Sequence, residues 1–335
     1  MTKLFFNYPT CIDHAIINRA GQIIGGSYHP IITVEGQPTA DEHVVVDFSG
    51  GKKMMKDIID AHDASGYDHK LWFVKGYSGA DYTYSADRVA VKSDKLSIEI
   101  PASDFRVIDS QPADLLKTAI AKEMSNDLTR IMRERGIQVT VNVELTHEPF
   151  TPRDATVFPF RYVHGLKDSS AYGCKNIAHG HYSFLAITKR SGEYRPDCDD
   201  CRFGEEQIER YFAMQDSILY INRKNIVEDS EDHLTIAYNT PRGEMRMRIL
   251  KPAIPHVILD SETTIEYLSE HIVQDLWSYL LLAKAEEVMI SEGLQKGVVV
   301  KIPQGWQSAP TMLRSAVTVP PVAPYASGGI LVSHG

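Results

Sequence analysis

The sequence has few cysteines, no long apolar run and no secretion signal, and each absence excludes a class of protein. Four of the 335 residues are cysteine, which is too few for a disulfide scaffold at this length, so we expect free thiols or metal ligands. No window approaches the roughly 18 consecutive apolar residues of a membrane-spanning helix. Because residues 1–9 also lack an apolar signal region, we expect a cytoplasmic protein without membrane contact.

An excess of positive charge is also missing. The formal net charge is −9, so the surface as a whole repels the phosphates of nucleic acids, and we expect no nucleic-acid partner. A small anionic substrate remains compatible, because an acidic protein can carry a local basic pocket. The sequence contains neither the glycine-rich dinucleotide fingerprint nor a phosphate-binding P-loop, so it does not indicate a nucleotide cofactor.

What the sequence does contain is one order of predicted elements that occurs twice. Each half is predicted to have strands, a helix, further strands, a long helix and a last strand. In the first half the predicted helices cover residues 52–61 and 112 to about 135, and the last strand covers 138–144. In the second half the predicted helices cover residues 205–214 and 263 to about 292, and the last strand covers 298–302.

This recurrence indicates a duplicated α+β chain. We expect domains at residues 1–150 and 151–310, joined by a proline-containing linker over 146–159, and a tail over 311–335 that is rich in Pro, Ser and Gly. Each domain is expected to hold an antiparallel sheet with two helices on one face. Such sheets expose strand edges, and closure into a barrel with further copies would cover them, so we expect a homo-oligomer.

The sharpest motif is His179-Gly180-His181 in a predicted strand. Residues two apart in a strand point to the same face, so both imidazoles can reach one ion. His164, on the preceding predicted strand, is the natural third ligand. Zinc favours nitrogen and sulfur ligands, and a catalytic zinc keeps one position open. The alternative is that these are a core histidine and two polar strand residues.

Two cysteine features accompany this motif. Cys174 precedes it by five residues and is a candidate proton-transfer base or nucleophile beside a metal. It is alternatively a small buried residue or a fourth zinc ligand. Cys198 and Cys201 form a lone Cys-x-x-Cys pair; a structural zinc would need two more ligands, so we expect an exposed loop there.

Together, Phe160-x-x-x-His164, Cys174 and His179-Gly-His-Tyr182 resemble the zinc motif of the 6-pyruvoyl-tetrahydropterin synthase and 6-carboxy-tetrahydropterin synthase family, the latter from the queuosine pathway. The rest of the family pattern is divided between the halves. The first half holds residues 45–48 (Val-Val-Asp-Phe), residues 68–71 (Asp-His-Lys-Leu) and Glu144, but has residues 24–28 in place of the metal motif, with His14 as a candidate remnant ligand. The second half holds residues 261–268, which resemble the family's Thr-Thr-Glu segment, but its final Glu is replaced near Gln304.

The resemblance implies two tandem T-fold domains, Zn²⁺ as the cofactor, and 7,8-dihydroneopterin triphosphate or a related dihydropterin as the substrate of a lyase or synthase. It also implies one complete active site shared between the halves. The implied metal ligands are His164, His179 and His181, the implied catalytic residues are Cys174, Asp68 and His69, and the implied substrate-binding residues are Glu144, Thr264 and Glu266.

Alternatives remain for several of these residues. Asp68 and His69 are alternatively a loop pair with no role, and Glu144 a solvated strand end. Glu266 alternatively favours the dipole of its helix. For the whole chain, the alternatives are a different reaction on a pterin-like or purine-like substrate, and a non-catalytic zinc-containing binding protein.

Overall fold

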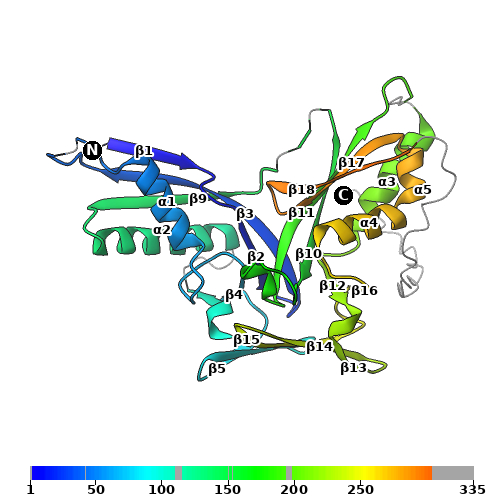
Figure 1. Ribbon diagram of the computed structural model, residues 1–335, viewed down its shortest axis with the longest axis horizontal. Coiled ribbons are helices and arrows are strands. Elements are labelled where there is room, and N and C mark those ends of the chain that lie inside the picture. The colour runs from blue at the N-terminus through cyan, green and yellow to red at the C-terminus, as the bar shows by residue number, and fades with distance from the viewer. Residues whose placement is uncertain are drawn as a thin grey trace, which may run out of the picture.

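Strands and helices follow one another in two series of similar order (Figure 1). The computed structural model describes residues 2–41, 43–109, 115–149, 151–152, 154–193 and 198–303, and every structural statement below concerns these residues. We call residues 2–149 the N-terminal half and residues 151–303 the C-terminal half. The predictions for Gln304 and the tail lie outside the described residues.

The N-terminal half contains, in order, β1 (Thr2–Asn7), β2 (Ile12–Ile17), β3 (Ile23–Gly36), α1 (Phe48–Ile59), β4 (Lys70–Val74), β5 (Asp81–Ser85), β6 (Arg88–Lys92), β7 (Leu96–Pro101), β8 (Phe105–Ile108), α2 (Leu116–Glu134) and β9 (Val139–Thr146). The C-terminal half contains β10 (Thr156–His164), β11 (His179–Lys189), α3 (Asp199–Ala213), β12 (Ile218–Asn222), β13 (Ile226–Asp229), β14 (His233–Thr240), β15 (Gly243–Leu250), β16 (His256–Leu259), α4 (Ile265–Asp275), α5 (Trp277–Leu282), β17 (Ala285–Glu292) and β18 (Lys296–Lys301). Among the described helices, none has the length and hydropathy needed to cross a membrane.

The strands form three six-stranded sheets. One belongs to the N-terminal half, in the order β1-β3-β2-β4-β8 with β9 also on β3, and one to the C-terminal half, in the order β16-β12-β10-β11-β17-β18. The third, β13-β14-β15-β7-β6-β5, is built from both halves, which join where β7 and β15 pair. The expectation of antiparallel sheets was wrong in part: β4 runs parallel to β2 and β8, and β12 runs parallel to β10 and β16. Parallel neighbours need a crossover connection, and α1 and α3 each lie within one.

The two halves meet where the β2–β3 hairpin crosses the β10–β11 hairpin, at the centre of Figure 1. A Cβ atom on Gly25 would lie 2.0 Å from the carbonyl oxygen of Tyr162, and one on Gly180 would lie 2.8 Å from Cα of Gly25. The main chains therefore approach so closely that glycine is required on both sides.

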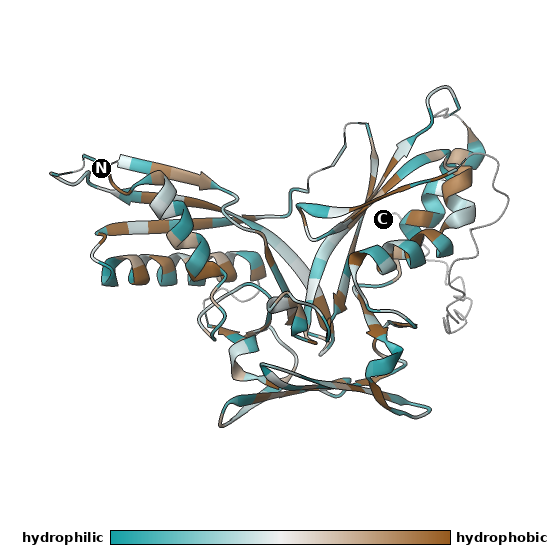
Figure 2. Ribbon diagram, in the orientation of Figure 1, coloured by the Kyte–Doolittle hydropathy of each residue, from teal (hydrophilic) through white to brown (hydrophobic). Residues whose placement is uncertain are grey.

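Three hydrophobic cores hold the molecule together. One lies under α1 and α2, where Ile120, Met124, Leu128 and Met132 recur at every fourth position and form the buried stripe of α2. A second lies under α3, α4 and α5. The third is shared, because it combines Leu71 and residues 96–100 with strands of the C-terminal half. Figure 2 shows the matching alternation of hydrophobic and hydrophilic bands along the strands and helices.

The predicted helix over residues 263–292 was wrong in its second part. The helices end at Leu282, Lys284 takes a positive φ of 56°, and β17 follows. Val288 and Ile290 are buried at alternate positions of β17, which pairs with both β11 and β18. Because residues 263–292 are apolar over long stretches, the sequence did not reveal where the hydrophobic spacing changes from that of a helix to that of a strand.

The exposed loop predicted at the Cys-x-x-Cys pair was also wrong. Cys198 is the N-cap residue of α3, and Cys201 lies in the first turn of this helix, where it is almost completely buried. Its burial shows that Cys201 packs as a small apolar residue of the helix rather than facing solvent.

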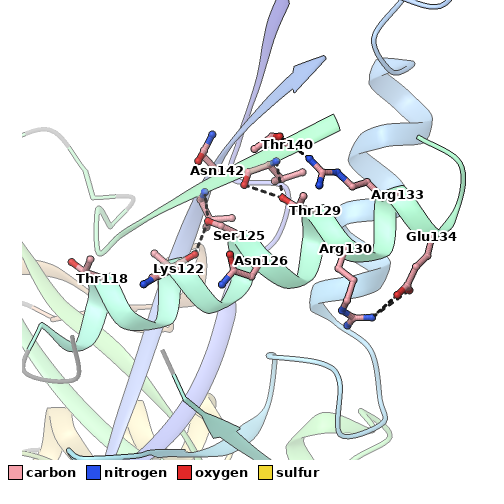
Figure 3. A pocket seen from close by; sticks show the side chains of 13 residues that line it. Thr118, Lys122, Ser125, Asn126, Thr129, Arg130, Arg133, Glu134, Thr140 and Asn142 are labelled. Atoms are coloured by element: carbon pink, nitrogen blue, oxygen red, sulfur yellow. Dashed lines mark hydrogen bonds and ion pairs between the residues drawn. The ribbon is translucent and has the colours of Figure 1, made fainter. Parts of the chain in front are cut away.

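The C-terminal sheet ends at β18, which pairs with β17 on one side, whereas the outer edge of β9 is covered within the chain. In the N-terminal half, side chains of α2 bind the main chain of β9 along the groove drawn in Figure 3. Ser125 and Thr129 accept the amide protons of Val143 and Val141, and Arg133 donates to the carbonyl of Val139. These side chains pair backbone groups that an edge strand otherwise leaves open, so this groove is a structural feature.

Candidate metal centre and adjacent proton-transfer group

Three buried histidines converge in the C-terminal half, close to the crossing of the two halves. His164 ends β10 and lies opposite His179, which begins β11, while His181 follows two positions later on the same face. Their ligand atoms lie within 4.8 Å of one another, and Nε2 of His164 is 3.1 Å from Nε2 of His181. This cluster, which we call the histidine triad, has the geometry that can bind a metal ion.

The surroundings of the triad direct the Nε2 atoms inward. Nδ1 of His164 lies 2.7 Å from the carbonyl oxygen of Thr263, and Nδ1 of His179 lies 2.6 Å from that of Asn176. Because a carbonyl oxygen only accepts, both Nδ1 atoms carry the proton, which leaves each Nε2 with a free lone pair. Nε2 of His179 is buried and has no hydrogen-bond partner within the described residues. The residues therefore fit a metal ion, since oxygen atoms that orient ligating histidines are the usual outer contacts of such sites.

Burial also keeps two members of the triad, His164 and His179, uncharged. Burial, and then the charge of His181, lower the pKa of His164 to about 3. Burial and the neighbouring His164 hold the pKa of His179 well below its ordinary value. Neutral imidazole is the form that binds a metal ion.

A Cys-His-Asp group lies next to the triad, and it is assembled from both halves. Sγ of Cys174 lies 3.6 Å from Nε2 of His69, and Nδ1 of His69 lies 2.6 Å from Oδ2 of Asp68. The ring of His69 is 5.0 Å from the ring of His179, measured between centroids. The predicted catalytic residues thus lie together beside the predicted metal ligands.

The placement of His69 involves conformational strain. Its φ is +54°, a left-handed value that is unusual for a side chain of this size. Its amide donates to the carbonyl of Asp13 and its carbonyl accepts from Nδ2 of Asn176, so both halves hold the backbone. Gly173, just before Cys174, makes room for the ring, because a Cβ there would lie 2.5 Å from Cγ of His69.

The electrostatics of His69 are opposite to those of the triad. Burial alone would lower its pKa, but the Asp68 carboxylate, by its charge and its hydrogen bond, together with Cys174, holds it well above the ordinary value. The cationic His69 lies within reach of the sulfur of Cys174, so a proton can pass between the two side chains. The group is therefore suited to hold and move a proton next to a metal ion.

Ligand assignment nevertheless has an alternative within the same cluster. Cys174, His69 and His179 also offer ligand atoms within 4.8 Å of one another. A thiolate at this distance is compatible with either the proton-transfer role or the predicted alternative of a fourth metal ligand.

Two carboxylates near the triad were not among the sequence predictions. Asp13 in β2 lies 3.1 Å from Nδ1 of His181. Glu292 ends β17 and is bound by Lys296 at 2.9 Å; burial raises its pKa, but the charges of His181, Lys296 and His164 lower it overall. Glu292 was not predicted, because it fell at the end of the predicted helix over residues 263–292. Asp13 carried no signal in the sequence.

The predicted substrate-binding residues lie outside this cluster. Glu144 is exposed on β9 and Glu266 is exposed in the first turn of α4. Thr264 is the half-buried N-cap residue of α4 and makes no capping hydrogen bond through its side chain. Within the described part of the chain none of the three joins a cluster that could hold a metal ion, and their roles stay predictions.

Neither a protein-family model nor a curated protein matches this chain. Among solved structures, it is similar to a catalytic-residue variant of 6-pyruvoyltetrahydropterin synthase from Plasmodium vivax, with 15% identity and a TM-score of 0.31 over 45% of this chain and 93% of that chain. The Plasmodium falciparum 6-pyruvoyl tetrahydropterin synthase gives 12% identity and a TM-score of 0.29 over 43% of this chain and 98% of that chain. Each similarity spans less than half of this chain, so the function proposed below rests on the geometry of the site.

Proposed function

We propose that the chain is a zinc-dependent pterin enzyme similar to the 6-pyruvoyl- and 6-carboxy-tetrahydropterin synthases, with 7,8-dihydroneopterin triphosphate or a related dihydropterin as its substrate. One observation carries the proposal: a Cys-His-Asp group from two distant parts of the chain lies against a buried histidine triad. A site that only stores a metal needs no such group. We further propose that the enzyme is cytoplasmic and acts as a homo-oligomer.

His164, His179 and His181 would hold the zinc ion through Nε2, with one coordination position left for the substrate. When bound, zinc supplies a Lewis acid that polarises hydroxyl or carbonyl oxygens of the substrate side chain and acidifies the neighbouring C–H and O–H groups. The carbonyls of Thr263 and Asn176 keep two of the rings in the required orientation.

Cys174 would take a proton from the acidified position through its sulfur. His69, at 3.6 Å, would hold the thiolate and return the proton to the neighbouring atom of the substrate. Asp68 would fix the His69 ring through its Nδ1 and stabilise the imidazolium. Such transfer suits an isomerisation, in which the substrate gains a proton from His69 for the one that Cys174 removes, and the proton on Cys174 then passes to His69. In an elimination, Cys174 would remove the C–H proton while the triphosphate leaves with the electron pair of the broken C–O bond.

A carboxylate is needed to anchor the pterin, whose amino and ring N–H groups form a pair of donors. Glu292 is suited to this role, because it is partly buried at the end of β17, close to the triad, and is paired with Lys296. Glu144 and Glu266 remain the candidates that the sequence indicates, and each would require the substrate, or a further copy of the chain, to reach an exposed position.

The test is an incubation of the zinc-loaded protein with 7,8-dihydroneopterin triphosphate, with products identified by mass spectrometry. We expect loss of triphosphate and a new tetrahydropterin, whose mass distinguishes the 6-pyruvoyl from the 6-carboxy product. The Cys174→Ala variant is the matched control. Unchanged substrate at full zinc occupancy would refute the synthase proposal and leave a different pterin-like substrate or a binding role.

A further inference from the structure

The strongest unexplained group near the triad is the carboxylate of Asp13. It belongs to β2 in the N-terminal half, yet Oδ1 lies 3.1 Å from Nδ1 of His181 in the C-terminal half. Its side chain is 5% exposed. A buried carboxylate is costly unless it has partners, so its position requires an explanation.

The orientation of Asp13 is fixed by neighbours that also touch the triad strand. The Ser27 hydroxyl donates to Oδ1 of Asp13 at 2.5 Å, and the same oxygen of Ser27 accepts the amide proton of Tyr182, the residue after His181. Ser27 therefore fixes the position of the Asp13 carboxylate relative to β11.

The backbone of Asp13 is tied to the proton-transfer group. Its amide donates to Oδ1 of Asp68 at 2.8 Å, and its carbonyl accepts from the amide of His69 at 2.6 Å. One residue therefore connects His181 on one side with Asp68 and His69 on the other.

The charges around Asp13 favour a cation at the triad. Asp68 pairs with His69, and Glu292 pairs with Lys296. The charges of His69 and Lys296 also act on Asp13, but no lysine or arginine side chain within the described residues makes an ion pair with it. A metal ion on the far nitrogen of His181 would place positive charge one imidazole ring away from this carboxylate, the arrangement in which a carboxylate both orients a ligating histidine and raises its basicity.

We propose that Asp13 is a positioning residue for the metal centre: supplied by the N-terminal half, it orients His181 for a divalent cation and makes the metal affinity depend on contact between the halves. The inference rests on the metal centre of the proposed function and not on the pterin reaction. It explains why the crossing of the halves is so close, since a wider separation would remove the carboxylate from the ring.

The test is a titration of the metal-free protein with Co²⁺, a visible-spectrum probe for zinc sites, without any pterin. For Asp13→Ala we expect about 10–100-fold weaker binding together with a changed absorption band. Asp13→Asn keeps the shape and an oxygen that faces Nδ1, so its loss should be smaller than that of Asp13→Ala. Ser27→Ala, which releases the carboxylate and also the amide of Tyr182, should weaken binding by a few-fold.

Asp127→Asn is the control for the general loss of a partly buried carboxylate, because Asp127 pairs with Arg106 and Tyr67 away from the triad. It should bind Co²⁺ as the unmodified protein does. Unchanged affinity and spectrum in folded Asp13 variants would overturn the proposal, as would an equal loss in Asp127→Asn. If Asp13→Ala does not fold, the nearly isosteric Asp13→Asn decides. Because no pterin is present, absence of catalytic turnover would leave this result intact.

Discussion

The two halves place different side chains at matching positions of the crossing. Gly25 lies opposite Ala15 in the N-terminal half, as Gly180 lies opposite Val163 in the C-terminal half, and the two glycines meet. When the two hairpins are aligned on these glycines, the three histidines of the triad, His164, His179 and His181, fall at the positions of Ile16, Ile24 and Gly26. The same backbone geometry thus carries three histidines that can bind a metal ion in one half and no such side chain at the three corresponding positions in the other.

Aromatic packing fills the corresponding space in the N-terminal half. The ring of His14 stacks on Trp72 with 3.7 Å between centroids, and on Tyr28 at 5.2 Å. A Cβ on Gly26 would lie 2.6 Å from the His14 ring. His14, expected as a remnant ligand, is therefore a core residue. It corresponds in position to Tyr162 and not to His164.

The two hairpins also differ in the charge that they carry next to the crossing. Asp13 and Arg161 lie at corresponding positions, two residues before Ala15 and Val163. Asp13 faces His181, whereas Arg161 donates to the carbonyl of Gly25 and lies over the ring of Tyr182. The charge near one crossing strand thus attracts a cation and the charge near the other repels one. Whether a hairpin at this crossing can bind a metal ion therefore depends on a few side chains, while the strand crossing stays the same.

The largest effect should come from removing one ligand. His179→Ala should abolish stoichiometric metal binding, because two imidazoles cannot form the site. His14→Ala removes a histidine from the filled pocket and should leave the metal content at one ion per chain while lowering stability. Metal analysis after dialysis measures the metal content of both variants. Equal metal loss in the two would contradict the assignment of His14 to the core.

Removing the sulfur of Cys174 is the next largest effect. Cys174→Ala should retain zinc and lower the rate of the proposed reaction by about 10²–10⁴-fold, the usual size for a proton-transfer residue. Steady-state rates and metal content should be measured on the same preparation. Simultaneous loss of zinc would instead identify Cys174 as a metal ligand.

Substitution at the crossing should affect both halves. Gly25→Ala places a methyl group against the carbonyl of Tyr162, and we expect the free energy of unfolding to fall by about 1–3 kcal/mol, as in overpacked cores. Gly50→Ala, in the exposed first turns of α1, is the control and should not destabilise the chain. Denaturant unfolding measures both; equal stability of the Gly25 variant would mean that the halves can separate freely.

The smallest effect is a change in the pH dependence of stability. Burial, and then the charge of Arg161, lower the pKa of His14 to about 3. Because the unfolded residue titrates near 6.5, this histidine stabilises the fold fully above that pH and progressively less as the pH falls toward 3. His14→Leu should reduce the slope of the free energy of unfolding against pH by up to about 1.4 kcal/mol per pH unit. Unfolding curves measured from about pH 4 to about pH 7 test this, and an unchanged slope in the variant would mean that His14 is already protonated in the fold.

Much of the site was predictable because its residues obey a local rule. The spacing of His179 and His181 places both rings on one face of any strand, and His164 follows from the adjacent strand. The bounds of α2 and the alternating burial along β9 were also close to the prediction, because hydrophobic residues recur at a regular spacing throughout each of these elements.

What could not be predicted depends on contacts between distant segments. Asp13 reaches His181 only because Gly25 and Gly180 allow two hairpins to cross. The end of the predicted helix at 263–292 depends on pairing of β17 with β11 and β18, which overrides the local pattern. The placement of His69 against Cys174 came from the family resemblance and had no basis in spacing.

The union of His69 and the histidine triad in one chain has a consequence for dilution. When the parts of a site belong to separate molecules, lowering the protein concentration separates them and activity per molecule falls. In this protein the Asp68–His69 segment and the C-terminal residues His179 and Cys174 are covalently connected, so each keeps a fixed high local concentration of the other. Whatever assembly the chain forms, Cys174, the Asp68–His69 segment and the histidine triad would remain together at protein concentrations at which an oligomer of single-domain subunits has dissociated.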